Sequence, residues 1–262
     1  MRKLLFFDLD GTLFVNGTQT FPDSVPEALN RAHKKGHLLF LNTGRVPCHL
    51  PPVLDSLPLD GRICGCGAHI QLGSRLLRSF SLDHAQSMQT LELFRASDIP
   101  AFFEGRSRIS FDPLLPRTPW TDSLSRLCRN MHILGSCSDP DFTFIKFFAF
   151  TDDEDRIREI AGCAPVTFQC VNRGGSPCGW EGVPLDFSKG RAIAETAQAL
   201  GASIEDCIAF GDSSNDLAML EACPVSVAMM NAPEHVKKAC TLVTDLPEQD
   251  GILHAMERLE LI

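Results

Sequence analysis

Two aspartates separated by a single residue are the part of this sequence best suited to chemistry. Asp8 and Asp10 lie in Phe6-Phe7-Asp8-Leu9-Asp10-Gly11-Thr12-Leu13, where an apolar run meets a Gly-Thr turn. Residues two apart in a strand point to the same face, so both carboxylates would leave the strand's C-terminal end together. Open α/β sheets build their ligand crevices at that edge. Taken alone, the pair could equally be an Asx turn that ends a strand.

Two more polar clusters follow short apolar runs elsewhere in the chain. The first is Thr43-Gly44-Arg45, after His37–Leu41; the second is Asp212, Asn215 and Asp216, after Asp206–Phe210. Parallel strands of one sheet end at the same edge, so we expect both clusters to converge with Asp8 and Asp10.

The expected cluster has the chemistry of a metal and phosphate site. Four neighbouring carboxylates repel one another unless a cation lies among them. Oxygen ligands without His or Cys favour Mg²⁺. The Thr43 hydroxyl, the backbone N–H near Gly44 and the Lys189 ammonium would donate hydrogen bonds to a phosphoryl group. Lys189 begins a predicted helix, where the helix dipole disfavours a cation, and this conflict favours a functional role.

The elements around these clusters alternate between apolar strands and amphipathic helices. A capping box at Ser24 and Glu27 predicts a helix that ends at Gly36. The alternation predicts an α/β fold with a doubly wound parallel sheet, built from residues 1–82 and 187–262. Residues 83–186 have a different sequence pattern, in which short runs of aromatic and β-branched residues alternate with amphipathic segments. Strands are expected at 102–103, 109–111, 142–150 and 166–171. Helices are expected at 84–96, 122–131 and 153–161. We expect this segment to be an inserted α+β cap domain.

The composition and charge of the chain indicate which kinds of partner it can bind. The 262 residues are 44% hydrophobic, with a formal net charge of −9, and no stripe of Lys and Arg is present, so we expect no nucleic-acid partner. There is no signal-peptide core and no apolar run of membrane length, so we expect a cytoplasmic protein without membrane contact.

The eleven cysteines are scattered, which favours reduced thiols. The close pair Cys64 and Cys66 is a weak sign of zinc. Nothing in the sequence indicates the oligomeric state.

Four motifs in order make the chain resemble the haloacid dehalogenase superfamily, in its Cof-type phosphatase branch with a large cap. The motifs are Asp8-Leu9-Asp10-Gly11-Thr12, Leu41-Asn42-Thr43-Gly44-Arg45, Ser188-Lys189-Gly190 and Gly211-Asp212-Ser213-Ser214-Asn215-Asp216. The resemblance spans nearly the whole chain. It implies a Rossmann-like core and a Mg²⁺-dependent phosphatase that acts on small phosphorylated metabolites, with sugar phosphates as the leading expectation.

The resemblance also implies roles for individual residues. Asp8 would be the nucleophile that becomes an aspartyl phosphate, and Asp10 the general acid and base. Mg²⁺ would be held by Asp8, the backbone carbonyl of Asp10 and Asp212, with Asp216 supporting Lys189. Thr43, Gly44, Arg45, Lys189 and Asn215 would contact the phosphate.

One departure and two alternatives remain open. Similar proteins carry Asn-Gly-Ala where this chain has Cys66-Gly67-Ala68, and we expect Cys66 to be a small buried side chain. The same core could belong to a phosphotransferase or sugar-phosphate mutase, which passes the phosphoryl group to a sugar hydroxyl. A catalytically silent metabolite-binding regulator is the alternative from another class.

Overall fold

The computed structural model describes residues 2–170 and 177–262. It divides into two compact units. The core unit comprises Met1–Arg45, Leu50–Ser79 and Phe187–Ile262, and the inserted unit comprises Val46–His49 and Phe80–Asp186. No helix in the described part of the chain is long and apolar enough to cross a membrane.

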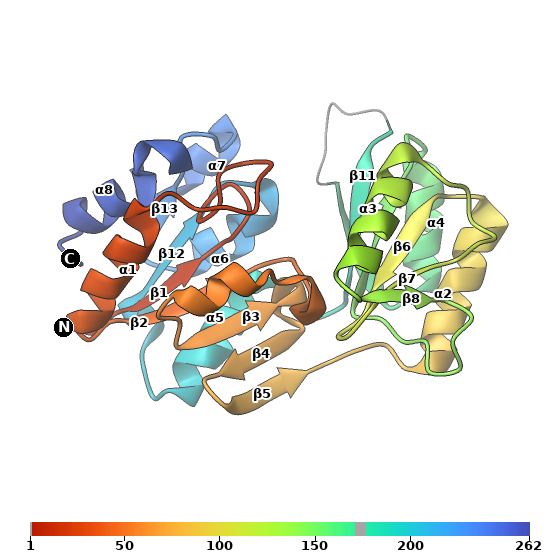
Figure 1. Ribbon diagram of the computed structural model, residues 1–262, viewed down its shortest axis with the longest axis horizontal. Helices are drawn as coiled ribbons and strands as arrows, with labels where there is room; N and C mark the ends of the chain where they lie inside the picture. The colour runs from red at the N-terminus through yellow and green to blue at the C-terminus, as the bar shows by residue number, and fades with distance from the viewer. Residues whose placement is uncertain (1, 171–176) are drawn as a thin grey trace. The chain divides into compact units, whose positions relative to one another are not determined.

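The core unit is built on an eight-stranded sheet (Figure 1). Its spatial order is β14 (Leu242–Val243), β13 (Val225–Ala228), β12 (Cys207–Gly211), β1 (Leu4–Phe7), β2 (Leu38–Asn42), β3 (Gly61–Cys64), β4 (His69–Leu72) and β5 (Arg75–Ser79). The first six strands are parallel, and β4 and β5 continue the sheet as antiparallel strands. All four residues of β1 are buried, as expected for a central strand covered on both faces.

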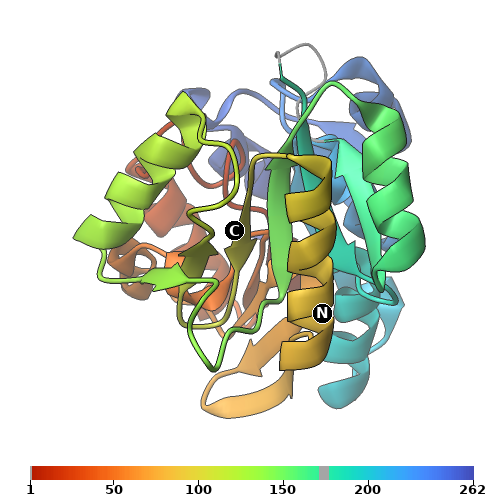
Figure 2. The same cartoon turned by 90° about the vertical axis from the view of Figure 1, so that its right-hand side faces the viewer.

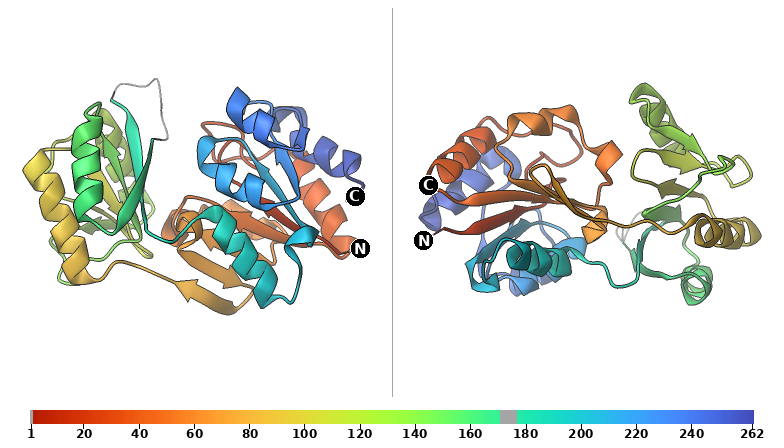
Figure 3. Two further views of the ribbon diagram at one scale, coloured as in Figure 1. Left: turned by 180° about the vertical axis from the view of Figure 1, so that it is seen from behind. Right: turned by 90° about the horizontal axis from the view of Figure 1, so that it is seen from below.

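Helices cover both faces of this sheet (Figure 3). On one face, α1 (Ser24–Lys34) and α8 (Gly251–Arg258) pack against Phe7, Leu39 and Phe210. On the other, α5 (Lys189–Ala199), α6 (Leu217–Ala222) and α7 (Glu234–Ala239) pack against Phe6 and Phe40. Successive residues of each central strand therefore pack against the helix layers on opposite faces of the sheet. The predicted doubly wound α/β fold is confirmed.

The inserted unit contains a six-stranded sheet, antiparallel except for one pair. Its order is β10 (Val166–Cys170), β11 (Gly179–Pro184), β9 (Lys146–Phe150), β6 (Ala101–Glu104), β7 (Ile109–Phe111) and β8 (Leu134–Ser136). One face packs on α2 (His84–Ser97) and α4 (Glu154–Cys163), which lie side by side in Figure 2. The other face packs on α3 (Pro119–Asn130). This is the α+β architecture that the sequence predicted.

Two local predictions are wrong. Ser24 does not cap α1: the helix is preceded by Asp23, and no side chain caps its first turn. The apolar run 142–150 forms a strand only from Lys146 onward, because Phe142 and Phe144 turn their rings into an aromatic cluster around Phe103. Apolar residues that fill a core without pairing look like strand residues in a sequence.

Candidate active site

The polar clusters lie at the ends of adjacent strands of the core unit. Asp8 follows β1, Thr43 follows β2 and Asp212 follows β12, and β1 lies between β2 and β12. The Asp8 N–H donates to the Phe210 carbonyl at 2.9 Å, which carries the β1–β12 pairing up to the aspartate. The topology therefore brings the clusters together, because all three strands run in the same direction.

Lys189 connects two of the clusters. It is the first residue of α5, and Ser188 before it caps the helix by accepting a hydrogen bond from the Arg191 N–H. Its ammonium donates to Asp8 Oδ1 and to Asp216 Oδ1, both at 2.6 Å, and its side chain is 1% exposed. A buried cation is costly unless it is paired. Here it has two carboxylate partners.

Asp216 organises the turn that carries Asp212. Its Oδ2 accepts hydrogen bonds from the backbone N–H groups of Asp212, at 3.0 Å, and Ser213, at 2.9 Å. Its other oxygen accepts from Lys189. The side chain of Asp216 is therefore fixed from both sides, and it fixes the direction of Asp212 in turn.

The carboxylates of Asp8, Asp212 and Asp216 could together hold a metal ion. One oxygen from each lies within 4.8 Å of the others, and all three residues are buried. No other group of this kind occurs among residues 2–170 and 177–262, so the pair Cys64 and Cys66 forms no zinc site with described residues. Three hard oxygen donors without His or Cys suit Mg²⁺.

The pKa values of three groups in this cluster are shifted by burial and by neighbouring charges. Burial, reinforced by Asp216, raises the pKa of Asp212 to about 7. Burial and Asp216 also raise the pKa of Asp8 well above its usual value, against the opposing effect of Lys189. Burial would lower the pKa of Lys189, but Asp216 and Asp8 hold it well above its ordinary value. One ammonium does not balance three carboxylates, and the donor set therefore fits a divalent cation.

Asp10 has a different environment from Asp8. Its side chain is 49% exposed, and both its oxygens accept from the Arg45 guanidinium, at 2.8 Å from Nε and 2.6 Å from Nη2. Bidentate pairing of this kind fixes the direction of a carboxylate. In the structure Arg45 therefore holds Asp10, and its predicted contact with the phosphate stays a prediction. Asp10 contributes no side-chain oxygen to the acidic triad.

Three other predicted phosphate-binding residues lie in or near the turns after β2 and β12. Thr43 is buried, and its hydroxyl accepts from the Arg45 N–H at 3.1 Å. Gly44 is half-buried between them. Asn215 is half-buried, and its side-chain oxygen accepts from the Ser213 hydroxyl at 2.6 Å. This contact lies within the turn that carries Asn215.

A match to a known family covers nearly the whole chain. The sequence pattern of the haloacid dehalogenase-like hydrolases matches residues 5–256. The chain belongs to this family. It is a phosphatase of the Cof-type branch of the haloacid dehalogenase superfamily.

Relatives of similar length carry phosphatase names. The chain is 28% identical to the pyridoxal phosphate phosphatase YbhA of Escherichia coli K12, over 95% of this chain and 96% of YbhA. It is 26% identical to the 5-amino-6-(5-phospho-D-ribitylamino)uracil phosphatase YcsE of Bacillus subtilis 168, over 97% and 94%. Among solved structures, the subclass IIB sugar phosphatase BT4131 superposes with a TM-score of 0.82 at 27% identity, over 99% of this chain and all of BT4131.

Two residues of this phosphatase's acidic site were not singled out from the sequence. The Thr12 hydroxyl donates to Asp212 Oδ1 at 3.0 Å. The Asn231 amide donates to Asp212 Oδ2 at 2.9 Å and to the Gly11 carbonyl at 3.0 Å. Asn231 follows the parallel strand β13, and a polar residue at that position was the available signal. Its Oδ1 is buried without a partner in the described residues, as expected of an acceptor beside a ligand site.

Gly11 is required where the first turn passes Asp212. Its φ is +87°, and a Cβ there would lie 2.4 Å from Asp212 Oδ2.

Gly17 has a φ of +75° but open space around the added carbon. Gly17→Ala should therefore cost about 1 kcal/mol of unfolding free energy, from backbone strain alone. Gly11→Ala should cost at least about twice that, because it also displaces a buried carboxylate. Urea unfolding of both variants measures the difference. Equal losses of unfolding free energy would mean that the side chain of Asp212 can move aside without cost.

Proposed function

We propose that this phosphatase hydrolyses small phosphorylated metabolites in two displacements, through an aspartyl phosphate on Asp8. The buried triad of Asp8, Asp212 and Asp216, beside the half-exposed Asp10, is the observation that carries the proposal. A buried carboxylate can attack phosphorus only if its negative charge is held in place and balanced. Lys189, at 2.6 Å from Asp8 Oδ1, holds one oxygen of Asp8, which leaves the other for the attack.

Asp10 is suited to move the proton in both displacements. A general acid must reach the leaving alkoxide, so it cannot be sealed in the protein, and the side chain of Asp10 is 49% exposed. Arg45 directs it by a two-point contact. In the first displacement Asp10 would give its proton to the leaving oxygen, and in the second it would take one from the attacking water.

Asp8, Asp212 and the backbone carbonyl of Asp10 would hold Mg²⁺, with Asp216 completing the acidic surroundings. The ion would neutralise the charge of the phosphoryl oxygens, which is where most catalysis of phosphoryl transfer arises. Thr43 and Lys189 would donate to the same oxygens. The pKa values of Asp8 and Asp212 are raised first by burial and then by neighbouring carboxylates. They support this assignment, because a cation among the carboxylates would offset both effects.

The substrate class is a small phosphate monoester. The sequence resemblance favours a sugar phosphate, and the name of BT4131 as a sugar phosphatase supports that expectation. The names of YbhA and YcsE, for pyridoxal phosphate and for a ribitylaminouracil phosphate, support an ester with a heteroaromatic ring. All three are consistent with one phosphoryl chemistry and different alcohols.

Removal and return of Mg²⁺ at different pH values tests this function. The proton on Asp212 must leave before the ion binds, so Mg²⁺ affinity should fall about tenfold per pH unit below about pH 7. The pKa of Asp8 is also raised, so a proton on Asp8 should make this fall steeper. A raised folded-state pKa means that the metal-free protein loses stability as the pH rises from about 4 to about 7, and Mg²⁺ should restore it.

Calorimetric titration of Mg²⁺ in buffers of different ionisation enthalpy counts the released protons. Phosphate release from p-nitrophenyl phosphate should stop in EDTA and return with excess Mg²⁺. Transfer of the phosphoryl group to added glucose, in place of inorganic phosphate release, would instead indicate a phosphotransferase. Affinity that does not change with pH would contradict the assignment of Asp212.

A further inference from the structure

Two cysteines lie at the facing ends of neighbouring strands in the inserted unit. Strand β10 ends at Cys170, and Cys178 directly precedes the first residue of β11. Cys170 is opposite Trp180 in the antiparallel register of these strands. Side chains alternate between the two faces of a strand, so Cys178, two residues before Trp180, lies on the same face as Cys170. The two thiols are in hydrogen-bond contact.

Hydrogen bonds on both sides hold the backbone of Cys178. Its N–H donates to Asp152 Oδ1 at 2.9 Å, and its carbonyl accepts from the Thr151 N–H at 3.0 Å. These bonds continue the pairing of β11 with β9, in which Gly179 is opposite Phe150. A fixed backbone therefore presents the Cys178 thiol to Cys170. The two sulfur atoms are already neighbours, which is the first requirement for a disulfide.

Both thiols can be reached by a small molecule in solution. Cys170 and Cys178 are partly exposed, whereas Cys128 and Cys137 of the same unit are buried. Burial, reinforced by Asp152, raises the pKa of Cys178. Less thiolate is then present at neutral pH, so Cys178 should react slowly with an oxidant and remain a thiol until the oxidant persists.

We propose that Cys170 and Cys178 form a reversible disulfide that joins the ends of β10 and β11 when the protein meets a small-molecule disulfide. One cysteine thiolate attacks the small disulfide, whose S–S bond breaks, and the departing thiolate takes up the proton that the cysteine lost. The second cysteine thiolate then attacks the mixed disulfide and displaces the other small thiol. The protein loses two hydrogen atoms in total, and the small disulfide is reduced to two thiols.

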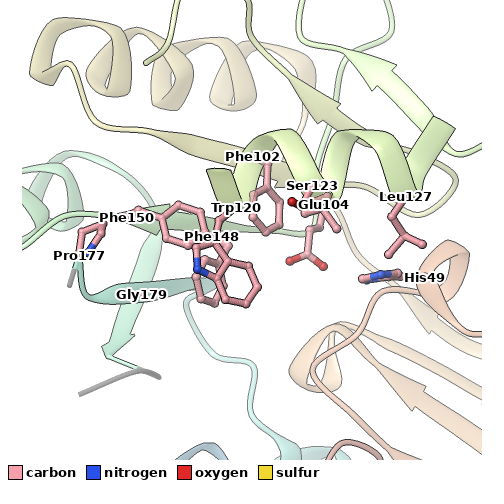
Figure 4. A pocket seen from close by; sticks show the side chains of 11 residues that line it. His49, Phe102, Glu104, Trp120, Ser123, Leu127, Phe148, Phe150, Pro177 and Gly179 are labelled. Atoms are coloured by element: carbon pink, nitrogen blue, oxygen red, sulfur yellow. The ribbon is translucent and has the colours of Figure 1, made fainter. Parts of the chain in front are cut away.

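The cross-link would restrain one wall of a cavity in the inserted unit. This cavity has a volume of about 540 Å³ and lies between α3 and the strands β6, β9 and β11. Figure 4 shows the aromatic side chains gathered along it: Phe102, Trp120, Phe148 and Phe150. Pro177 and Gly179, on either side of Cys178, also line the cavity. A disulfide reduces the conformational freedom of the segment that it closes, so this wall should open less often in the oxidised protein.

Incubation of the full chain with oxidised glutathione at about pH 8.5, near the ordinary pKa of a thiol, tests the proposal. After the remaining thiols are blocked with N-ethylmaleimide, trypsin cleaves at Arg173 and separates the two cysteines onto peptides 159–173 and 174–189. We expect mass spectrometry to find these peptides joined, and to find them separate after treatment with dithiothreitol. Cys163 shares the first peptide with Cys170, so Cys163→Ser is the matched control and should give the same joined pair. Loss of the joined pair in Cys163→Ser would overturn the proposal.

Single variants in the Cys163→Ser background distinguish a disulfide from two independently reactive thiols. In Cys170→Ser or Cys178→Ser, the remaining thiol lacks the partner that would displace glutathione, so it should retain glutathione as a mixed disulfide. The parent protein should retain almost none at either position. Cys207 and Cys223 are the internal control, because they also interact with each other but are both buried. A parent protein that retains glutathione on both Cys170 and Cys178, or reacts at neither, would overturn the proposal.

Amide hydrogen exchange measures the restraint on the cavity wall. Exchange of the β11 amides, Gly179–Pro184, should slow about tenfold or more in the oxidised protein and recover after reduction. Cys178→Ser treated in the same way should show no change. Unchanged exchange in a fully cross-linked protein would overturn the inferred effect on the wall.

Discussion

Replacement of Asp8 by Asn should lower phosphate release by about 10⁴-fold or more, because it removes the nucleophile and one charged oxygen of the metal site together. The change is nearly isosteric, and the Asn oxygen can still accept from Lys189. The fold should therefore persist, which circular dichroism and thermal unfolding can verify. The rate is measured as inorganic phosphate released from p-nitrophenyl phosphate at saturating Mg²⁺.

A labelling experiment distinguishes the nucleophile from a residue that only supports the site. With a ³²P-labelled ester, rapidly quenched native enzyme should carry hydroxylamine-sensitive label, as an acyl phosphate does, and Asp8→Asn should carry none. Asp10→Asn should still become labelled although its turnover falls, because Asp10 moves protons and forms no bond to phosphorus. Asp23→Asn, at an exposed position before α1, serves as the neutral control. Label on the Asp8→Asn variant would show that the nucleophile is another residue.

Replacement of Lys189 by Met should be the most destabilising single change at the acidic site. It leaves the buried carboxylates of Asp8 and Asp216 facing each other without the ammonium that now lies 2.6 Å from each. Removal of one member of a buried ionic group costs about 3–5 kcal/mol. Phosphate release should also fall by about 10²-fold to 10³-fold, since a donor to the phosphoryl oxygens is lost.

The electrostatic origin of this loss has two signatures. In urea unfolding with EDTA present, the cost of Lys189→Met should shrink as the pH falls, because the facing carboxylates then become protonated. Adding Asp216→Asn should recover part of the lost stability by removing one of the opposed charges. Lys237→Met is the control on α7, where Lys237 pairs at 3.2 Å with Glu234, whose side chain is 76% exposed; a pair with such an exposed partner is worth about 1 kcal/mol or less. A loss that is independent of pH would indicate packing in place of charge.

The core fold could be predicted because its signals are local. Buried parallel strands are continuous apolar runs, and the polar residues that follow Phe7, Leu41 and Gly211 mark strand ends on one edge. The antiparallel pair β4 and β5 was not predicted, because Arg75–Ser79 is mostly exposed and has no clear alternation. The family resemblance supplied the order of the motifs, and the sheet topology explains why that order converges.

The partners of individual side chains could not be predicted in the same way. The sequence did not predict that Arg45 pairs with Asp10, which lies 35 positions away; its contact with the phosphate stays a prediction. Asn231 contacts Asp212 from the turn after β13, and no spacing rule connects the two. A cavity of the inserted unit is a third example: Phe102, Trp120 and Phe148 line it from three separate elements, and only the folded chain brings them together.

The acidic site and the aromatic cavity share no side chain. Asp8, Lys189 and Asp212 belong to the core unit, and Phe102, Trp120 and Phe148, which line the cavity, belong to the inserted unit. A substitution among the cavity residues therefore removes no carboxylate and no ammonium of the acidic site. Sequence changes confined to α3 and β9 can accumulate without altering the groups that we expect to cleave the phosphate ester.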